Sequence, residues 1–242
     1  MKKRIDLLLV EKNLAESRNK AQSKIRAGKV FADGVRIDKP SELVDSDAEI
    51  FLQKDKFEFV SRAGFKLQHA IENFRIDLQD KIAVDVGAST GGFTDCMLQH
   101  GAKKIYAVDV GTNQLAEKLK TDSRVVSLEQ VNFRHVDKEI FNDDRIDFVS
   151  IDVSFISLEK ILPVVFELFE NAEVVALIKP QFEVGKNLVG KNGIVKNANA
   201  RKKAVENVEN FAQNLGFKIL GRIDSPITGS DGNVEYLIYL GR

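Results

Sequence analysis

The sequence predicts an α/β protein in which a doubly wound, mostly parallel sheet follows a small α+β unit. Two observations predict this architecture. From Ser61 onward, short and nearly continuous apolar runs alternate with segments of helical periodicity, which is typical of a parallel sheet covered on both faces. Before Ser61, helices come first and short strands follow. We therefore expect two domains, residues 1–60 and 61–242.

The N-terminal domain is expected to contain two helices and then short strands. Apolar residues within 5–9 recur at helical spacing, and Ser17 is suited to cap a second helix over 18–26. Asp33-Gly34 separates two apolar runs, a strong signal for a β-hairpin. A further strand is expected over 48–52.

The C-terminal domain is expected to alternate helices and strands. Helices are expected over 61–74, after Gly92, over 158–169 and over 199–215. Seven strands are expected, over 82–86, 105–110, 125–126, 148–153, 174–178, 218–223 and 236–240. Such an alternation builds an open sheet whose ligands bind outside the carboxyl ends of the parallel strands.

Composition excludes several classes of protein. Hydrophobic residues make up 43% and charged residues 30%, which excludes a disordered chain. Apolar runs such as 174–178 are far shorter than the ~20 residues that cross a bilayer, and the N-terminal stretch is too charged for a signal peptide. One cysteine and three scattered histidines give neither an internal disulfide nor a zinc cluster. We expect a cytoplasmic protein without a metal or a membrane partner.

The neutral net charge hides two basic segments. Residues 1–40 contain eleven basic and five acidic residues, a net of +6, and residues 179–203 contain seven basic and one acidic, again +6. Residues 41–60 are acidic, with a net of −4. Two basic segments on a neutral protein suggest two contact surfaces for a polyanion, although either alone could be a solvated face.

A glycine-rich loop after the first strand of the second domain predicts a cofactor site. The spacing Gly-x-x-x-Gly-Gly differs from the dinucleotide motif, and Asp85 just ahead of it would repel a pyrophosphate. We therefore expect Asp85 to meet a cationic amino group. The predicted contacts in and around this loop are Asp85, Gly87, Ala88, Ser89, Thr90, Gly91, Gly92 and Phe93.

Asp109 closes the next strand, twenty-two positions beyond Gly87, where a carboxylate can accept hydrogen bonds from both hydroxyls of a ribose. A ribose with an amino-acid tail and no diphosphate describes S-adenosylmethionine, which is the expected cofactor. Asn132, after another expected strand, is a weaker candidate for contact with the adenine edge and could equally be an ordinary loop residue.

Charged residues also stand at other strand ends. Asp152 and Lys179 follow expected strands, so both are placed at the carboxyl edge of the sheet. Glu235 precedes the last strand and reaches that edge only if this strand is antiparallel. Lys66 would have to join them from the helix ahead of the first strand.

The first domain resembles the small S-four RNA-binding domain, named after a ribosomal protein. The resemblance rests on Arg4-Ile5-Asp6, Ser17-Arg18, residues 25–30 and Asp33-Gly34. It implies that the second helix and the hairpin bind structured RNA; a protein-docking module is the alternative. The expected RNA contacts are Arg4, Arg18, Lys20, Lys24, Arg26 and Lys29.

The chain as a whole resembles the TlyA (haemolysin A) family, in which an S-four-type domain is joined to an FtsJ-type RNA 2′-O-methyltransferase. The matching motifs are residues 61–67, the glycine loop, 147–157 and 178–183, with Ala63 where many relatives have glycine. The resemblance implies a Rossmann-like methyltransferase fold with an antiparallel last strand. It also implies a catalytic tetrad of Lys66, Asp152, Lys179 and Glu235, Asp152 being a cofactor contact as well, and ribosomal RNA or ribosomal subunits as partner.

A ribose hydroxyl is a poor nucleophile and needs a base within about 3 Å of its proton. We expect Lys179 to serve as that base in its neutral form, which the positive charge of Lys66 would favour. Asp152 would position Lys179, and Glu235 would fix Lys66 or the ribose. Direct transfer from a sulfonium requires neither a metal nor a covalent intermediate, and orientation would supply much of the rate.

The second basic segment, residues 185–203, is expected to clamp RNA beside the site, with Lys186 as a contact, or else to be a solvated loop. Phe65, Phe155 or Phe182 could stack on a flipped base, although core packing is the commoner role of a phenylalanine. Three other functions stay open: a membrane-active haemolysin, an RNA-binding or ribosome-binding factor with a silent methyltransferase fold, and a small-molecule methyltransferase. The nucleotide, the subunit and the oligomeric state are not predicted.

Overall fold

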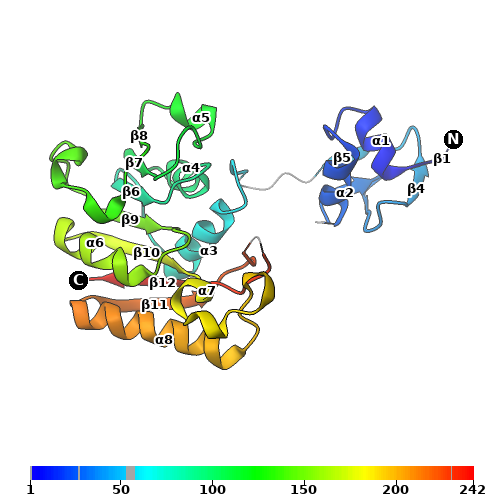
Figure 1. The fold of residues 1–242 in the computed structure, drawn as a ribbon. Helices are drawn as coiled ribbons and strands as arrows, with labels where there is room; N and C mark the ends of the chain where they lie inside the picture. Colours follow the sequence, from blue (N-terminus) through cyan, green and yellow to red (C-terminus); the bar gives the residue numbers. More distant parts are fainter. Residues whose placement is uncertain (1, 27, 53–57, 230) are drawn as a thin grey trace. The chain divides into compact units, whose positions relative to one another are not determined.

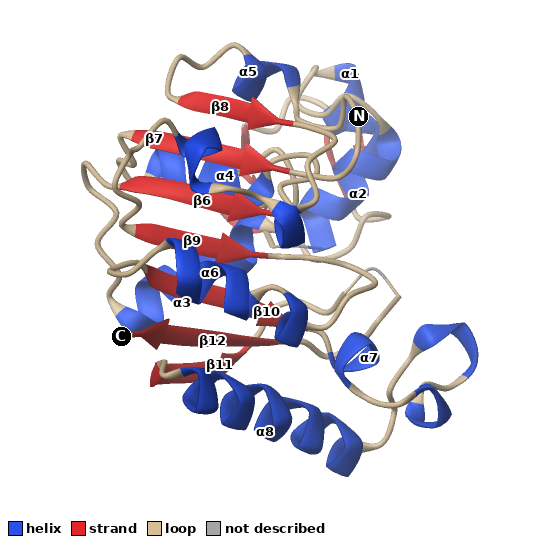
Figure 2. Cartoon of the chain, turned by 60° about the vertical axis from the view of Figure 1, so that its left-hand side comes forward, coloured by secondary structure: helices blue, strands red, loops and turns tan. Residues whose placement is uncertain are grey.

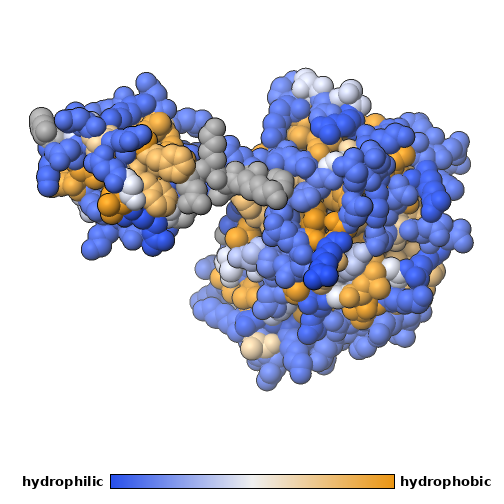
Figure 3. Space-filling view, turned by 180° about the vertical axis from the view of Figure 1, so that it is seen from behind, coloured by the Kyte–Doolittle hydropathy of each residue, from blue (hydrophilic) through white to orange (hydrophobic). Residues whose placement is uncertain are grey.

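The computed structural model of the chain describes residues 2–26, 28–52, 58–229 and 231–242. The chain divides into two compact units, Met1–Glu58 and Phe59–Arg242 (Figure 1). Each unit has its own hydrophobic core. On the face shown in Figure 3, the surface of each unit is mainly hydrophilic, with hydrophobic patches between the hydrophilic residues.

The N-terminal unit packs two helices against short antiparallel strands. Helix α1 spans Ile5–Glu11 and α2 spans Arg18–Arg26. Strands β2 (Val30–Ala32), β3 (Val35–Arg36) and β5 (Ile50–Leu52) form a three-stranded sheet in the order β3-β2-β5, and β1 (Lys2–Arg4) pairs with β4 (Leu43–Asp45). The two helices and the hairpin follow the sequence prediction, whereas β1 and β4 were not predicted.

The hairpin turn shows why Asp-Gly was informative. Asp33 and Gly34 have φ values of +48° and +77°, the left-handed backbone that a two-residue turn between twisted strands requires. Glycine adopts this conformation without strain, and aspartate tolerates it better than most residues. Asp33 Oδ1 also accepts a hydrogen bond from the Glu49 backbone N–H at 2.8 Å. This bond connects the turn to the residue that directly precedes β5.

The C-terminal unit is built on a seven-stranded sheet in the order β11-β12-β10-β9-β6-β7-β8 (Figure 2). Strand β12 runs antiparallel to both of its neighbours, while the pairs from β10 to β8 are parallel. The predicted antiparallel last strand is therefore confirmed. The strands are β6 (Ile82–Val86), β7 (Lys104–Val108), β8 (Val125–Leu128), β9 (Phe148–Ile151), β10 (Glu173–Ile178), β11 (Lys218–Asp224) and β12 (Tyr236–Gly241).

Helices cover both faces of this sheet, as a doubly wound fold requires (Figure 2). Side chains of β12 alternate between the two cores: Leu237 and Tyr239 join the cluster that contains α3 and α4, whereas Ile238 and Leu240 join that of α6 and α8. The helices are α3 (Gly64–Phe74), α4 (Gly92–Gln99), α5 (Glu117–Lys120), α6 (Leu162–Leu168), α7 (Pro180–Glu183) and α8 (Ala198–Leu215).

Two helices are shorter than the sequence indicated. Helix α3 begins at Gly64 because the preceding residues form a turn. In this turn the Gly64 N–H donates a hydrogen bond to the Ser61 carbonyl at 3.2 Å. The expected helix over 158–169 consists of a 3₁₀ turn, Leu158–Lys160, followed by α6. Pro163 lies in the first turn of α6, where its missing N–H costs no hydrogen bond.

Three charged residues of the predicted site each come directly after the end of a parallel strand. Strand β7 ends one residue before Asp109, β9 one before Asp152, and β10 one before Lys179. Because these strands are parallel, the three side chains are delivered to the same edge of the sheet. The antiparallel β12 begins at that edge, immediately after Glu235.

Candidate active site

The glycine loop crosses the carboxyl edge of the sheet between β6 and α4. Gly87 has a φ of +83°, and a Cβ at this position would lie 2.6 Å from the backbone oxygen of Asp152. The N–H groups of Gly87 and Ala88 both donate to the Val108 carbonyl, at 2.9 and 3.1 Å. Only glycine satisfies both the backbone conformation and the close approach, so the loop lies flat against the ends of β7 and β9.

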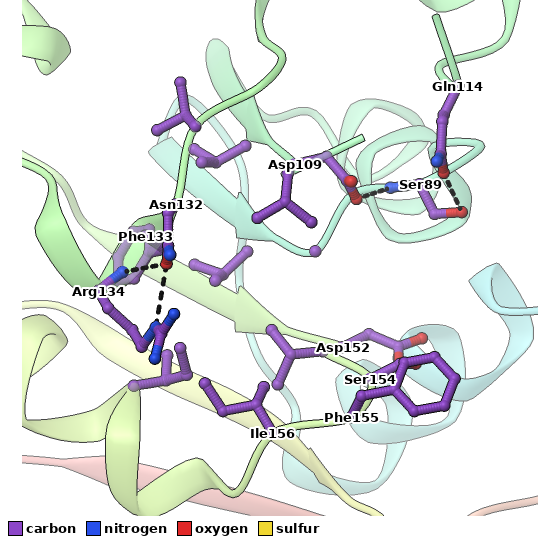
Figure 4. A pocket seen from close by; sticks show the side chains of 17 residues that line it. Ser89, Asp109, Gln114, Asn132, Phe133, Arg134, Asp152, Ser154, Phe155 and Ile156 are labelled. Atoms are coloured by element: carbon purple, nitrogen blue, oxygen red, sulfur yellow. Dashed lines mark hydrogen bonds between the residues drawn. The ribbon is translucent and has the colours of Figure 1, made fainter. Parts of the chain in front are cut away.

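A cavity of about 540 Å³ opens beside this loop. It extends from Gly87 and Ser89 past Asp109 to the segment around Asn132, and its other wall is formed by residues 152–156 (Figure 4). A smaller hollow of about 200 Å³ shares Gly87, Asp152 and Ser154 with it. The predicted loop residues Ala88, Ser89, Thr90, Gly92 and Phe93 line the smaller hollow, as do Arg62 and Lys179.

Asp109 lies in the wall of the larger cavity and also shapes the glycine loop. Its Oδ2 accepts a hydrogen bond from the Ser89 N–H at 2.8 Å (Figure 4). Its Oδ1 accepts one from the Gly111 N–H at 2.7 Å. Each oxygen keeps a further lone pair for a ligand. Asn132 also lines this cavity, and its side-chain oxygen accepts from the Arg134 N–H and Nε at 3.2 Å each.

The structure buries Asp85 beneath the glycine loop, whereas the sequence predicted a contact between Asp85 and a cationic amino group. Its side chain is fully buried under the loop and lines none of the cavities described here. One carboxylate oxygen accepts from Thr94 Oγ1 at 2.6 Å and the other from Ser150 Oγ at 2.9 Å. Asp85 therefore joins β6 to α4 and β9, so its contribution to a ligand site is to hold the loop that forms it.

Burial raises the pKa of the Asp85 carboxyl to about 6. Hydrogen bonds from Thr94 and Ser150 favour the charged form and lower this pKa, but burial has the larger effect. The folded protein therefore binds this proton at a higher pH than the unfolded chain. As pH rises from about 4 through 6, we expect the free energy of unfolding of the C-terminal unit to lose about 2–3 kcal/mol from this group. The free energy of unfolding of Asp85→Asn should not fall in this way over the same pH range. Equal pH dependence of the free energy of unfolding in wild type and variant would contradict the raised pKa of Asp85.

The structure brings all four tetrad residues together as two ion pairs. Lys66 Nζ on α3 lies 2.6 Å from Glu235 Oε2, and the two residues are only 5% and 3% exposed. Lys179 Nζ lies 2.7 Å from Asp152 Oδ1. Lys179 and Glu235 line one further hollow, so the two pairs meet at a common space.

Ser154 is a site residue that the sequence interpretation left without a role. Lys179 Nζ and Asp152 Oδ1 are close enough for an ion pair, but the angles of this contact are not those of a hydrogen bond. Lys179 Nζ instead donates a hydrogen bond to Ser154 Oγ at 2.9 Å. Ser154 also lines all three cavities. A signal was present, because Ser154 stands two residues after Asp152 at a strand end, but a serine there is common in ordinary turns.

The basic residues predicted to bind RNA in the N-terminal unit fall into two groups. Arg4 and Arg18 both bind the fully buried Asp6, at 3.0 and 2.9 Å, and Arg4 holds the pKa of that carboxyl well below its usual range. They are therefore structural ion-pair partners whose outer surfaces remain partly exposed. Lys20 and Arg26 are exposed, and Lys24 and Lys29 are half-buried.

The second basic segment lies beside the tetrad. Asn233, two residues before Glu235, donates from Nδ2 to the Gly193 carbonyl at 2.9 Å and accepts from the Val195 N–H at 3.0 Å. These bonds fix the segment to the start of β12. Lys191, Lys196, Lys202 and Lys203 are exposed along it. The side chain of Lys186 lies outside the described residues, although its backbone forms a 3₁₀ turn over 186–188.

Residues 59–242, the whole C-terminal unit, match the family model of FtsJ-like methyltransferases. The chain belongs to the FtsJ-like methyltransferase family. Residues 3–50 match the S4 domain. Within the described residues, no helix is long and apolar enough to span a membrane.

Proteins similar to this FtsJ-like chain over nearly its full length are known. Hemolysin A of Brachyspira hyodysenteriae is 47% identical, over 98% of each chain. The 16S/23S rRNA (cytidine-2′-O)-methyltransferase TlyA of Mycobacterium tuberculosis is 43% identical, over 98% of this chain and 89% of its own. The solved structure of a "Putative hemolysin from Streptococcus thermophilus" superposes with a TM-score of 0.75 at 47% identity, covering 100% of this chain and 88% of that one.

Proposed function

We propose that this protein transfers the methyl group of S-adenosylmethionine to a ribose 2′-hydroxyl of ribosomal RNA. The observation that carries the proposal is the pair of lysine–carboxylate contacts, Lys66–Glu235 and Lys179–Asp152, beside the glycine-loop cavity. Four segments far apart in the sequence deliver these side chains to one edge of the sheet. The rRNA methyltransferase TlyA named above supports the same substrate class.

The residues around the loop fit S-adenosylmethionine. Asp109 would accept the two ribose hydroxyls, and Asn132 would lie at the adenine edge, because both line the 540 Å³ cavity. The smaller hollow, which runs from the loop to Lys179, would take the amino-acid tail. Asp152 lines both spaces, so the donor sulfur would lie close to the tetrad. The cofactor supplies an electrophilic methyl group on a sulfonium.

Lys179 is proposed as the base that takes the proton of the 2′-hydroxyl. Its Nζ lies 2.7 Å from Asp152 Oδ1, so this contact must loosen for the amine to turn toward the substrate hydroxyl. Asp152 and Ser154 hold the Nζ in place. Lys66, fixed by Glu235, would hold the hydroxyl or its phosphate.

RNA would be bound by basic residues of both units. In the N-terminal unit the exposed Lys20 and Arg26 and the outer surfaces of Arg4 and Arg18 supply positive charge. In the C-terminal unit, residues 191–203 would clamp the backbone beside the tetrad, because they are fixed next to Glu235. Phe155 is 91% exposed at the cavity and is suited to stack on an unpaired base.

Asp109→Ala is expected to weaken S-adenosylmethionine binding by about 10- to 100-fold, because it removes the acceptor for both ribose hydroxyls and releases the Ser89 N–H. Isothermal titration calorimetry measures the Kd. Asp122→Ala is the matched control, since Asp122 pairs with Arg124 outside the cavity. Equal affinities for wild type and Asp109→Ala would rule out this role.

The proposed function is tested by mapping ribose methylation in ribosomal RNA from cells with and without the gene. We expect at least one 2′-O-methyl group to disappear on deletion and to return with the wild-type gene. A gene encoding Lys179→Ala should not restore it. Identical maps in all strains would contradict the proposal.

A further inference from the structure

A short turn that follows β8 forms part of the wall of the 540 Å³ cavity. The Val131 N–H donates to the Asp109 carbonyl at 3.0 Å, so the turn lies beside the residue proposed to hold the ribose. It continues as a 3₁₀ turn, Phe133–His135, whose phenylalanine is buried in the core and only 4% exposed. Asn132 and Arg134, on either side of this phenylalanine in the sequence, both line the cavity (Figure 4).

The side-chain amide of Asn132 is held in one direction by Arg134. Asn132 Oδ1 accepts two hydrogen bonds, from the backbone N–H and from the Nε–H of Arg134, at 3.2 Å each (Figure 4). Exchanging the oxygen and the nitrogen of the amide would place its NH₂ group against these two donors. A carbonyl oxygen accepts through two lone pairs, so Oδ1 has none left for a ligand.

The NH₂ group is therefore the part of the Asn132 side chain that a ligand can bind. Asn132 is half-buried in the cavity wall. Its Nδ2 has no hydrogen-bond partner among the described residues and is not fully buried. An amide nitrogen carries two N–H donors and no acceptor. The ligand group that fits this position is a hydrogen-bond acceptor.

Adenine offers such acceptors on its ring. Its nitrogens N1, N3 and N7 each carry a lone pair, whereas its exocyclic amino group donates. An asparagine oxygen would therefore select the amino group, and an asparagine NH₂ group selects a ring nitrogen. The cavity wall also suits the apolar faces of a planar ring, because Val110, Val131 and Ile156 line it.

We propose that Asn132 binds the adenine of the cofactor by donating from Nδ2 to a ring nitrogen, and that Arg134 is a positioning residue that keeps the amide in this direction. The inference rests on the proposed function and deepens it, because it states which partner donates in the adenine contact. The sequence alone left the direction of this hydrogen bond open and assigned no role to Arg134.

The test measures, by isothermal titration calorimetry, the Kd of S-adenosylhomocysteine and of its 1-deaza, 3-deaza and 7-deaza analogues, in which a C–H replaces one ring nitrogen. S-adenosylhomocysteine lacks the sulfonium charge, so a charge introduced at Asn132 does not act on the sulfur. We expect wild type to bind one analogue about 5- to 30-fold more weakly than S-adenosylhomocysteine, the usual loss when one hydrogen bond is removed. The other two analogues should bind within about threefold of it.

Three variants are compared by the ratio of the Kd of that analogue to the Kd of S-adenosylhomocysteine. Asn132→Asp keeps the acceptor for Arg134 but replaces Nδ2 by an oxygen, so the ratio should fall to unity or below. Arg134→Met keeps the backbone N–H and removes Nε, so the amide turns more freely and the ratio should fall by about threefold. Arg145→Met is the matched control, since Arg145 is exposed outside this cavity, and it should keep the wild-type ratio.

Equal binding of all four ligands by wild type would overturn the inference, and so would an Asn132→Asp protein that keeps the wild-type ratio. An unchanged ratio in Arg134→Met would overturn its positioning role, because a merely structural role changes all four Kd values alike. These results leave the methyltransferase assignment standing. If wild type binds neither S-adenosylhomocysteine nor S-adenosylmethionine, the proposed function itself is contradicted.

Discussion

Lys179→Ala is expected to lower kcat for methyl transfer by about 10²–10⁴-fold, the usual contribution of a general base. The substitution removes the amine that takes the proton of the hydroxyl, and it leaves Asp152 without its cationic partner. The Kd for S-adenosylmethionine should change much less than kcat, since Asp109 and the glycine loop are untouched and, of the two cofactor spaces, Lys179 borders only that for the amino-acid tail. Single-turnover transfer of a labelled methyl group and calorimetry measure the two quantities.

Lys218→Ala provides the matched control for this loss. Lys218 is exposed at the start of β11, where it pairs with Gly241 at the end of the sheet opposite to the tetrad. The Lys218→Ala substitution removes one positive charge, as Lys179→Ala does, but far from the site. The rate of methyl transfer by Lys218→Ala should therefore equal that of wild type. A Lys179→Ala protein that transfers methyl groups at the wild-type rate would exclude Lys179 as the base.

Glu235→Leu is expected to destabilise the C-terminal unit by about 3–5 kcal/mol, because it leaves the Lys66 ammonium buried without its partner. The double variant Lys66→Met/Glu235→Leu should recover most of this stability, since two apolar side chains replace the pair. Methyl transfer should remain lost in both. Hydrogen exchange of the β10 and β12 amides reports the stability of this unit.

The double variant separates two roles of the pair. If it is as unstable as Glu235→Leu alone, the unpaired charge is not the cause of the instability. If it is stable and still transfers methyl groups at the wild-type rate, Lys66 and Glu235 are structural residues only. An unstable Glu235→Leu protein together with a stable but inactive double variant is the expected result. A purely structural pair would leave the double variant active, and a purely catalytic pair would leave Glu235→Leu stable.

The sheet and its active edge were predictable because their signals are local. Each buried parallel strand appears as a short apolar run, and Asp109, Asp152 and Lys179 each follow such a run directly. Residues that directly follow parallel strands lie at the same edge of the sheet, however far apart they are in the sequence. The position of Glu235 depended on the direction of β12, which the family resemblance implied and the structure confirms.

Asp85 shows where local signals fail. In a strand buried on both faces, an aspartate near the loop can point to the ligand or into the core, and the sequence does not distinguish the two. Its partners Thr94 and Ser150 come from α4 and β9, so only the fold brings them together. The same holds for Arg4 and Arg18, because the sequence does not show that both side chains pair with the buried Asp6.

Short elements and single polar atoms were also beyond the sequence. Strands β1 and β4 have three residues each, too few to show a period of two. Ser154 belongs to a motif that matched the family, yet its contact with Lys179 depends on a distance between two segments that the sequence does not show. Such roles arise from packing between segments and become visible only in three dimensions.

The central claim is that the tetrad edge transfers a methyl group to a ribose oxygen of ribosomal RNA. The most direct measurement incubates the protein with trideuteromethyl S-adenosylmethionine and ribosomal subunits from cells lacking the gene, digests the RNA to nucleosides and analyses them by mass spectrometry. We expect deuterium in a 2′-O-methyl nucleoside, and none when Lys179→Ala replaces wild type. Deuterium on a methylated base, or an equal yield from both proteins, would contradict the claim.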